Sequence, residues 1–409
     1  MTDVRKISIE AYDYPLQEHQ IARYPLEQRD QSKLLLQLGK KISEDTFSQL
    51  AHYLPSETLL ITNETKVIQA RLHFKNANGA SIEVFCLEPA ENEGDSQIKI
   101  SSKSPVKWKC FVGNSKRWKS DSLRMEINPS GFGTLIEVKR LEKKGDHSII
   151  EFSWDNQDIT FGQILETAGE LPLPPYLNRK AENSDSIRYQ TIFAQNEGSV
   201  AAPTASLHFS KEVVNSLKSK GISLTNVTLH VGAGTFKPVS TDTIGEHDMH
   251  AERIFVSRAT VEKLLSHLGK PIIPIGTTSM RTIESLYWIG LKLLTDEITS
   301  QVLKVDQWTP YKYEYDASTI SAERTLQAIL MFMDTHNLNE IHASTSVMIA
   351  PGYTFKIATG LITNFHQPKS TLLLLVSALI GDQWKEVYDY ALRNNFRFLS
   401  YGDSCLFIP

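Results

Sequence analysis

The pattern of hydrophobic and polar positions changes twice along the chain. Residues 1–66 are mixed, whereas residues 67–152 consist of six short alternating or β-branched runs separated by Gly, Asn, Ser and Asp. The runs are ARLHF, ASIEVFCLE, WKCFV, LRMEIN, TLIEVKRL and SIIEFSW. After Thr160, strand-like runs alternate with helical patterns. The middle pattern is typical of a small barrel or sandwich, and the last of an α/β or α+β domain. We therefore predict a mixed α/β domain built from 1–66 and 153–409, interrupted by an inserted all-β, barrel-like domain at 67–152.

In the larger domain, three predicted strands each run into a loop of small and polar residues. The strands at 223–231, 271–275 and 360–365 lead into the loops 232–235, 276–279 and 366–370, respectively. A helix after the second loop places Met280, Ile283, Leu286 and Tyr287 on one face. Ser370 can cap the apolar helix TLLLLVSALI that follows the third loop. Loops of this kind at strand ends favour a ligand site in an open sheet.

Composition narrows the classes of protein further. The 409 residues are 41% hydrophobic and 22% charged, with a net charge of −4, as in a soluble globular protein. The 3 cysteines are far apart and form no CxxC motif, which argues against a disulfide scaffold or a zinc finger. The N-terminus has no apolar signal region, and the longest apolar run, 371–380, is too short for a membrane helix. We expect a cytoplasmic protein, with LNRKAENSDSIRYQ at 177–190 as a polar surface loop.

Two segments of the larger domain are candidate sites. In HVGAGTF (230–236), a glycine pair follows a strand, as in a nucleotide-binding turn, but Pro238 disfavours the helix that should come next. A tight turn or another kind of ligand loop are the alternatives. EHDMHAE (246–252) offers His247, His250 and Glu252 for acid–base chemistry. The histidines lack the zincin spacing, so a metal site is less favoured than an acid–base cluster or a solvated turn.

Two further segments combine a helix with polar residues. GTTSMRTIES (276–285) opens a helix whose free N–H groups suit a carboxylate or a phosphate. Arg281 can clamp the same anion or pair with Glu284 one turn away. LITNFHQPKS (361–370) holds polar side chains between apolar stretches, where they are either paired or functional. The last segment is also consistent with a simple strand-to-helix turn.

The predicted β-domain carries a basic stretch. Between Lys99 and Lys119 there are basic residues and no acidic ones, and Trp108, Phe111 and Trp118 lie among them. Basic side chains hold phosphates, and aromatic faces stack unpaired bases. The stretch is a candidate RNA-binding surface through Lys107, Lys109, Lys116, Arg117 and Lys119. The alternative is a solvated hairpin whose aromatic residues belong to the core.

Ten segments of the chain, in order, resemble the S-adenosylmethionine:tRNA ribosyltransferase-isomerases of queuosine biosynthesis. They span residues 24–403 and read YPLEQRDQSKLL, GELPLPPYLNR, IRYQTIFA, GSVAAPTASLHF, TLHVGAGTFKPV, EHDMHAE, GTTSMRTIES, PGYTFK, LITNFHQPKSTLLLLVSALIG and RFLSYGD. The resemblance covers the chain apart from the predicted insert and about 295–345. The sequence departs from the family pattern at Glu64, Gln69, Ser206 and 342–345.

The resemblance implies a reaction. The ribosyl moiety of S-adenosylmethionine would be transferred to 7-aminomethyl-7-deazaguanine at the tRNA wobble position and isomerised, which gives epoxyqueuosine and releases adenine and methionine. S-adenosylmethionine would be a co-substrate, with no true cofactor, no metal, no membrane and no obligate protein partner. The family's fold likewise has a small β-barrel inserted into a larger domain. The alternatives are an S-adenosylmethionine-dependent RNA methyltransferase that uses the GAGT loop, or a non-catalytic tRNA-binding paralogue.

The resemblance also implies roles for residues at the matching positions. The reaction needs a general base, a proton donor for adenine and a clamp for the methionine carboxylate. We expect the catalytic residues to be His230, His247, His250 and Glu252. Gly276–Ser279 and Arg281 would face an anionic end, while Thr204 and Asn364 would bind the nucleoside. The full set of expected substrate-binding residues is Thr204, His208, Gly232, Gly234, Thr277, Thr278, Ser279, Arg281, Asn364, His366 and Lys369.

Overall fold

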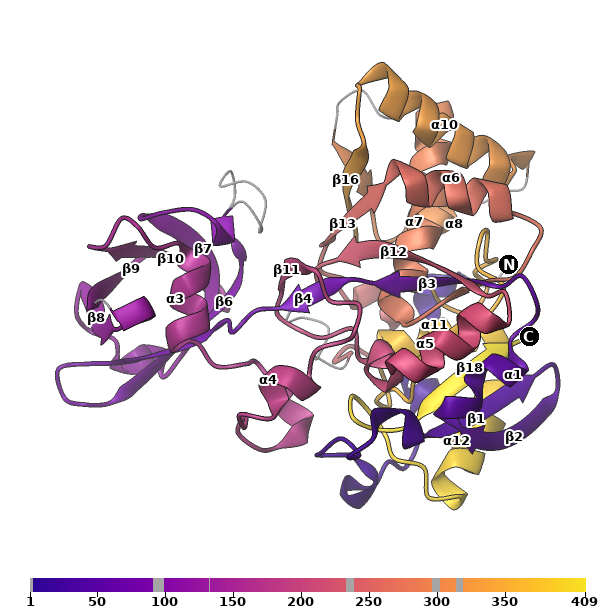
Figure 1. The fold of residues 1–409 in the computed structure, drawn as a ribbon, viewed down its shortest axis with the longest axis horizontal. Coiled ribbons are helices and arrows are strands. Elements are labelled where there is room, and N and C mark those ends of the chain that lie inside the picture. The colour runs from indigo at the N-terminus through magenta and orange to yellow at the C-terminus, as the bar shows by residue number, and fades with distance from the viewer. Residues whose placement is uncertain (1–2, 91–98, 132, 233–238, 296–301, 314–318) are drawn as a thin grey trace.

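The computed structural model describes residues 3–90, 99–131, 133–232, 239–295, 302–313 and 319–409. Figure 1 shows a compact β-rich unit at one side of the molecule and a larger mixed α/β body at the other, with the two chain ends in the body. The body holds a six-stranded sheet and a four-stranded sheet, and the smaller unit is a second six-stranded sheet. A short parallel pair, β4 (Thr65–Val67) and β11 (Asn196–Ser199), lies between them.

The six-stranded sheet of the body positions most of the polar loops. Its order is β14-β3-β12-β13-β16-β15, and β14, β3 and β12 run parallel to one another. Strand β13 is antiparallel to both β12 and β16. The carboxyl ends of the three parallel strands therefore meet at one edge. The bounds are β3 (Leu59–Asn63), β12 (Ser223–Leu229), β13 (Glu252–Ser257), β14 (Ile272–Pro274), β15 (Leu303–Val305) and β16 (Glu340–Thr345).

The four-stranded sheet joins the two ends of the sequence. Its order is β17-β18-β1-β2, with the C-terminal strand β18 parallel to β1. An isolated bridge from Ile275 to Ile362 links it to the end of β14. The third predicted strand is thus β17, which belongs to this sheet but ends beside the other two. The bounds are β1 (Lys33–Leu38), β2 (Lys41–Thr46), β17 (Leu361–Asn364) and β18 (Ser404–Ile408).

The smaller unit contains all six strands predicted for it. The strands form one antiparallel sheet in the order β5-β6-β7-β10-β9-β8, and the end strands β5 and β8 lie against each other, so the sheet is nearly a closed barrel. Alternate positions of β10 are buried, as the alternating sequence predicts. The bounds are β5 (Arg71–Lys75), β6 (Ser81–Pro89), β7 (Val106–Gly113), β8 (Ser122–Ile127), β9 (Thr134–Lys144) and β10 (His147–Trp154).

The core of the barrel extends past residue 152. Helix α3 (Phe161–Ala168) packs its buried face on the barrel, and Phe161 stacks beside Trp154 at 6.1 Å between ring centroids. The chain enters and leaves at neighbouring points, because Arg71 and Glu170 exchange backbone hydrogen bonds of 3.2 and 2.8 Å. A Cβ atom at Gly169 would lie 1.9 Å from the Gln69 carbonyl oxygen, so this crossing requires glycine.

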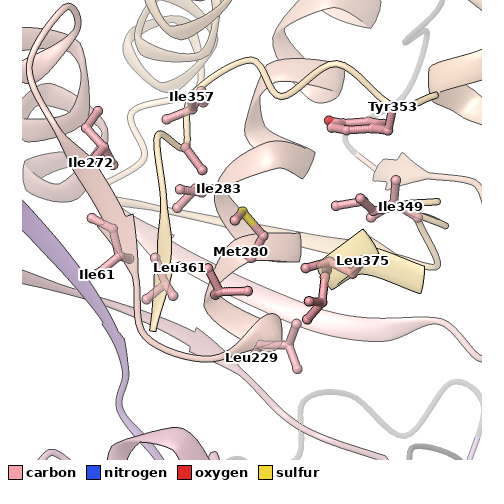
Figure 2. Packing of buried hydrophobic residues seen from close by; sticks show 14 of the residues in the cluster. Ile61, Leu229, Ile272, Met280, Ile283, Ile349, Tyr353, Ile357, Leu361 and Leu375 are labelled. Carbon is pink, nitrogen blue, oxygen red and sulfur yellow. The ribbon is translucent and has the colours of Figure 1, made fainter. Parts of the chain in front are cut away.

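Helices cover the sheets of the body. Helix α7 begins after Gly276 and is buried at nearly every position through Leu291, as the apolar face predicted around Met280 requires. Figure 2 shows Met280 and Ile283 packed among Ile61, Leu229 and Leu361 from three strands. Ser370 caps α11 by accepting the Leu373 N–H, which confirms the predicted cap and buried helix. The helices of the body include α1 (Leu50–Tyr53), α4 (Asp185–Arg188), α5 (Lys211–Ser219), α6 (Arg258–His267), α7 (Thr277–Leu294), α8 (Thr309–Lys312), α10 (Ala322–Thr335), α11 (Thr371–Ile380) and α12 (Gln383–Arg393).

The segment 177–190 is more structured than a polar surface loop. It contains α4, and Asp185 at the start of that helix is 1% exposed. The Asp185 carboxylate accepts two hydrogen bonds of 2.7 Å from Arg179 and one of 2.7 Å from the Tyr401 hydroxyl. Most of the segment lies at the surface, as expected, but it is not only a loop, because it contains a helix and a distant tyrosine completes a buried ion pair within it.

Glu284 of α7 holds the loop that precedes β17. Its buried carboxylate accepts the backbone N–H groups of Lys356, Ile357 and Ala358 at 2.9 Å and the Tyr353 hydroxyl at 2.7 Å. Burial raises the pKa of Glu284, and these four donors lower it in part.

No helix in the described part of the chain has the length and apolar character to cross a bilayer.

Replacing Glu284 by alanine should strongly destabilise the fold. Four buried donors lose their acceptor, so we expect Glu284→Ala to lower the free energy of unfolding by about 3–5 kcal/mol. Urea denaturation measures this change. The matched control is Glu386→Ala, which removes an exposed carboxylate from α12 and should cost less than about 0.5 kcal/mol. Equal losses in the two variants would contradict the anchoring role.

Candidate functional site

The polar loops converge where the parallel strands of the body end. Asn63, the last residue of β3, accepts the backbone N–H groups of Thr65 and Leu229 at 3.1 Å and donates to the Leu229 carbonyl at 3.0 Å. Ser199 accepts the Val231 N–H at 3.0 Å and donates to the Ala201 carbonyl at 2.7 Å. These two side chains connect the strand ends to residues 201–204, which we call the AAPT loop.

An inner cavity of about 100 Å³ lies at this edge of the sheet. Gly276, at a φ of +87°, leads into α7, so the unbonded N–H groups of the first turn face the cavity region. The predicted residues that the structure brings together here are Thr204, Thr277, Thr278, Asn364 and His366. The inner cavity is therefore lined by polar groups from the second and third predicted loops and from the AAPT loop.

Hydrogen bonds fix the orientation of Asn364 and the protonation of His208. Thr204 donates to Asn364 Oδ1 at 2.8 Å, so Asn364 Nδ2 is the donor to His208 Nε2 at 3.0 Å. His208 Nε2 must then be unprotonated, and Nδ1 donates to the Ser32 hydroxyl at 2.9 Å. Burial lowers the pKa of His208 to about 4. His208 does not line the inner cavity but positions Asn364, which does.

His366 is a second buried, neutral histidine. It lines the inner cavity, and its Nε2 lies 3.0 Å from the Thr363 hydroxyl. Burial lowers its pKa to about 3. The backbone N–H of His366 donates to the Tyr388 hydroxyl at 3.1 Å, and its carbonyl accepts from the Tyr14 hydroxyl. This ring can therefore accept a hydrogen bond from a ligand without carrying a charge at neutral pH.

A second cavity of about 320 Å³ lies between the body and the barrel, and we call it the barrel-facing cavity. The body contributes His230, Gly232, His250 and Glu252, and the barrel contributes residues that include Lys109, Phe111 and His147. Val231 lines both this cavity and the inner one, so they adjoin. Three of the four expected catalytic residues thus share one cavity with side chains of the barrel.

His230 is fixed at the end of β12. It is 7% exposed, its Nδ1 lies 2.8 Å from the Thr65 hydroxyl, and its ring packs at 5.3 Å from Phe255. His250 is exposed and lies on the loop before β13. The two histidines therefore differ in their surroundings, because a hydroxyl holds the buried His230 and a loop carries the exposed His250.

Arg281 pairs with Glu252 and not with Glu284. Arg281 Nη1 forms a buried ion pair with the Glu252 carboxylate, and Nε donates to the Val347 carbonyl at 3.3 Å. The alternative in which Arg281 pairs one turn along the helix was wrong, because Glu284 faces the 356–358 backbone instead. The expected anion clamp also finds its guanidinium already engaged by a carboxylate.

The remaining predicted residues are placed away from the two cavities. His247 is half-buried, its carbonyl accepts from Gln307 at 2.7 Å, and burial and then the charge of His250 lower its pKa. Lys369 forms ion pairs with Glu10 at 2.9 Å and Asp13 at 3.2 Å. Ser279 is fully buried in α7. Gly234 lies outside the described residues, and so do residues 235–238, where the helix of a methyltransferase turn would begin.

The aromatic residues of the basic stretch belong mainly to the barrel core. Trp108 is fully buried and Trp118 is 7% exposed, with the Arg140 guanidinium 4.6 Å from the Trp118 ring. These two rings are therefore not available to stack bases, which agrees with the alternative that the aromatic residues of the stretch belong to the core. Phe111 is half-buried at the barrel-facing cavity, and Lys109 pairs there with Glu88 at 2.9 Å. The other basic residues of the candidate surface are Lys107 in β7 and Lys116, Arg117 and Lys119 around η6 (Ser115–Arg117).

Sequence reasoning missed the framework residues. Asn63, Thr65 and Ser199 hold the strand ends through contacts with Leu229, His230 and Val231, which are distant in sequence, so no local pattern signals them. Glu64, a departure from the family pattern, accepts from Asn226 at 2.9 Å and from Asn196 at 3.1 Å. It lines a separate open groove of about 840 Å³ that holds none of the expected site residues. Within the described residues, no three His, Cys, Asp or Glu side chains are grouped to hold a metal ion.

The fold and its two adjoining cavities define a class of protein: an α/β body with a polar cavity at parallel strand ends and a β-barrel beside it. The family model described as "Queuosine biosynthesis protein" matches residues 9–407. The chain therefore belongs to the queuosine biosynthesis protein family.

Two relatives extend over almost the whole chain. An S-adenosylmethionine:tRNA ribosyltransferase-isomerase of Trichlorobacter lovleyi is 35% identical over 98% of this chain and 99% of its own. One of Pelobacter propionicus is 34% identical over 97% and 98%. The crystal structure of an S-adenosylmethionine tRNA ribosyltransferase from Thermotoga maritima is 26% identical over 97% of this chain and 99% of its own, with a TM-score of 0.45.

The neutral His208 should make the stability depend on pH. Between pH 6.5 and about 4, the unfolded chain binds a proton that the folded chain excludes from His208, so stability is lost as pH falls. We expect His208→Gln to flatten this dependence by up to about 1.4 kcal/mol per pH unit. Urea denaturation across this range measures it, with the exposed His52→Gln as control. A slope equal to that of the wild type would contradict the assignment.

Proposed function

We propose that this chain is an S-adenosylmethionine:tRNA ribosyltransferase-isomerase. It transfers the ribosyl moiety of S-adenosylmethionine to a 7-aminomethyl-7-deazaguanine base in tRNA, isomerises it to the epoxide, and releases adenine and methionine. The barrel-facing cavity carries the proposal, because it places His230, His250 and Glu252 opposite side chains of the barrel. A large substrate that contacts both parts can present its base to these residues. The names of both relatives support the same reaction.

The two adjoining cavities together receive the two substrates. S-adenosylmethionine is larger than the inner cavity of about 100 Å³, so it extends from there toward the barrel-facing cavity. Thr204 and Asn364 face its nucleoside, and the first turn of α7 receives its carboxylate. The tRNA base enters through the barrel-facing cavity and meets the ribosyl carbon near Val231, which lines both. The reaction consumes S-adenosylmethionine as a co-substrate, and the proposed chemistry uses neither a metal nor a resident cofactor.

The acid–base work falls to residues of the barrel-facing cavity. A base must remove a proton beside the sulfonium, and a proton must reach the departing adenine. His230 and His250 are the candidates for these two transfers, because an imidazole can both accept and donate a proton. Glu252, held by Arg281, supplies negative charge near the sulfonium and the developing positive charge of the ribosyl carbon. His247 lies on the same loop and positions it through Gln307.

The barrel acts as an inserted domain that contacts tRNA. The crossing at Gln69 and Gly169 supports limits of about residue 70 and about residue 169 for this insert. Lys107, Lys109, Lys116, Arg117 and Lys119 provide phosphate contacts on this domain. Phe111, at the edge of the cavity, offers an aromatic face to a base. A tRNA substrate supports a cytoplasmic location for the reaction.

The products of one reaction test the proposal. Purified protein is incubated with S-adenosylmethionine and tRNA that carries the aminomethyl-deazaguanine base. We expect release of adenine and methionine together with a ribosyl-derived gain in the mass of the modified nucleoside. S-adenosylhomocysteine with a methyl gain would show a methyltransferase, and tRNA binding without any product would show a non-catalytic protein; either outcome overturns the proposal.

His250→Ala should abolish turnover and leave the fold intact. The side chain is exposed, so its loss costs little stability, but it removes a proton-transfer group from the barrel-facing cavity. We expect adenine release to fall by at least about 100-fold, within the range for general acid–base catalysis. The thermal unfolding midpoint should stay unchanged, and His19→Ala, at another exposed histidine, should retain full activity. Full activity of His250→Ala would remove this residue from the mechanism.

A further inference from the structure

A small pocket beside the inner cavity is lined by three arginines from distant parts of the sequence. Arg29, Arg188 and Arg397 meet there with His208, Ser400 and Tyr401. The three arginines come from the segments YPLEQRDQSKLL, IRYQTIFA and RFLSYGD, none of which has a part in the proposed reaction so far. Ser400 also lines the inner cavity, and His208 is bonded to Asn364 of that cavity. We call this site the arginine pocket.

The arginine pocket carries more positive than negative charge. In the described part of the chain, Arg29 and Arg188 donate hydrogen bonds only to backbone carbonyls. Arg29 donates to Gln190 at 3.3 Å, and Arg188 donates to Glu27 at 3.0 Å and to Leu26. Arg397 lies 3.5 Å from the Asp403 carboxylate, which also accepts the backbone N–H groups of Lys33 and Arg397. The lining of the pocket thus includes three arginines and no acidic residue.

The arrangement is costly without a ligand. Burial lowers the pKa of Arg29, and the charge of Arg188 lowers it further, so the folded chain holds these two like charges together at an energetic cost. The Arg188 Nε atom is also buried and has no hydrogen-bond acceptor among the described residues. An anion in the pocket would relieve the repulsion and satisfy this donor. No acidic residue among those that line the pocket does so.

The size and charge of the pocket select among anions. Its volume of about 20 Å³ admits little more than one water-sized group, so an oxygen of a larger ligand reaches in while the rest stays outside. A methionine zwitterion would bring an ammonium group toward three guanidinium groups, which repel it. A phosphate has oxygens that match the fork of arginine and carries no positive charge.

We propose that the arginine pocket binds one phosphodiester group of the tRNA strand that carries the substrate base. This inference rests on the proposed function, which supplies tRNA as the substrate. The pocket adjoins the inner cavity at Ser400, so a phosphate held there fixes the strand beside the reacting centre. The arginines position the substrate through its backbone and take no part in the bond-making steps.

The test measures tRNA binding by Arg29→Gln over a series of salt concentrations. Fluorescence anisotropy with the precursor tRNA gives the affinity, and calorimetry gives the affinity for S-adenosylmethionine. We expect tRNA binding to weaken by about tenfold. The slope of log affinity against log salt should become shallower by about 0.7–0.9, the effect of one lost phosphate contact. Binding of S-adenosylmethionine should not change.

Matched variants separate charge from structure. Arg324→Gln removes an exposed charge from α10, far from the pocket, and should keep the wild-type slope. Arg29→Lys retains the charge and should restore most of the slope. Arg397→Gln tests the pocket from another element if Arg29→Gln does not fold.

Two results would overturn the inference. One is a salt slope and a tRNA affinity equal to those of the wild type in both Arg29→Gln and Arg397→Gln. The other is weakened S-adenosylmethionine binding with unchanged tRNA binding in these variants. Binding is measured without turnover. A wild-type protein that forms no product therefore rejects the proposed function, whereas the slopes of the variants decide on the pocket.

Discussion

The buried ion pair between Arg281 and Glu252 is the interaction on which the site depends most. Arg281 belongs to the first turns of α7, whose N-terminus borders the inner cavity, and Glu252 begins β13 beside the barrel-facing cavity. Both side chains are nearly inaccessible, so neither charge has water as an alternative partner. A buried charge that loses its partner costs several kcal/mol. The pair therefore fixes the two cavities relative to each other.

Around this pair, the strand ends are held by neutral polar side chains. Asn63 and Ser199 satisfy backbone groups of β12 and the AAPT loop. His208 accepts a hydrogen bond from Asn364 and so holds that side chain in place, and burial keeps the His208 ring uncharged. These neutral groups satisfy one another and the buried backbone at the strand ends without adding charge there. Fixed donors and acceptors of this kind cost no reorganisation during the reaction.

Local patterns allowed much of the fold to be predicted. The six runs of alternating residues became the six barrel strands, and the Ser370 cap and the α7 and α11 helices formed where expected, because periodicity and capping act over a few residues. The failures involved partners that are distant in sequence. Arg281 chose Glu252, 29 residues away, over Glu284 three residues away. Asp185 became buried through Tyr401, 216 residues further along the chain.

The candidate site was predictable to the level of segments but not of roles. Ordered segments pointed to the loops that line the cavities, yet Lys369 faces Glu10 and Asp13, and Trp108 fills the barrel core. Sequence spacing gives no direction for a side chain on a loop, since the backbone there has no fixed period. The arginine pocket shows the same limit, because its three residues meet only after the N-terminal, central and C-terminal segments pack together.

Hydrogen–deuterium exchange with and without S-adenosylmethionine tests most directly whether the inner cavity at the strand ends is the substrate site. The account predicts slower backbone exchange at residues 199–205, 276–280 and 363–373, which surround the inner cavity. Protection confined to residues 221–226 and 257–260, the walls of the large open groove, would contradict it.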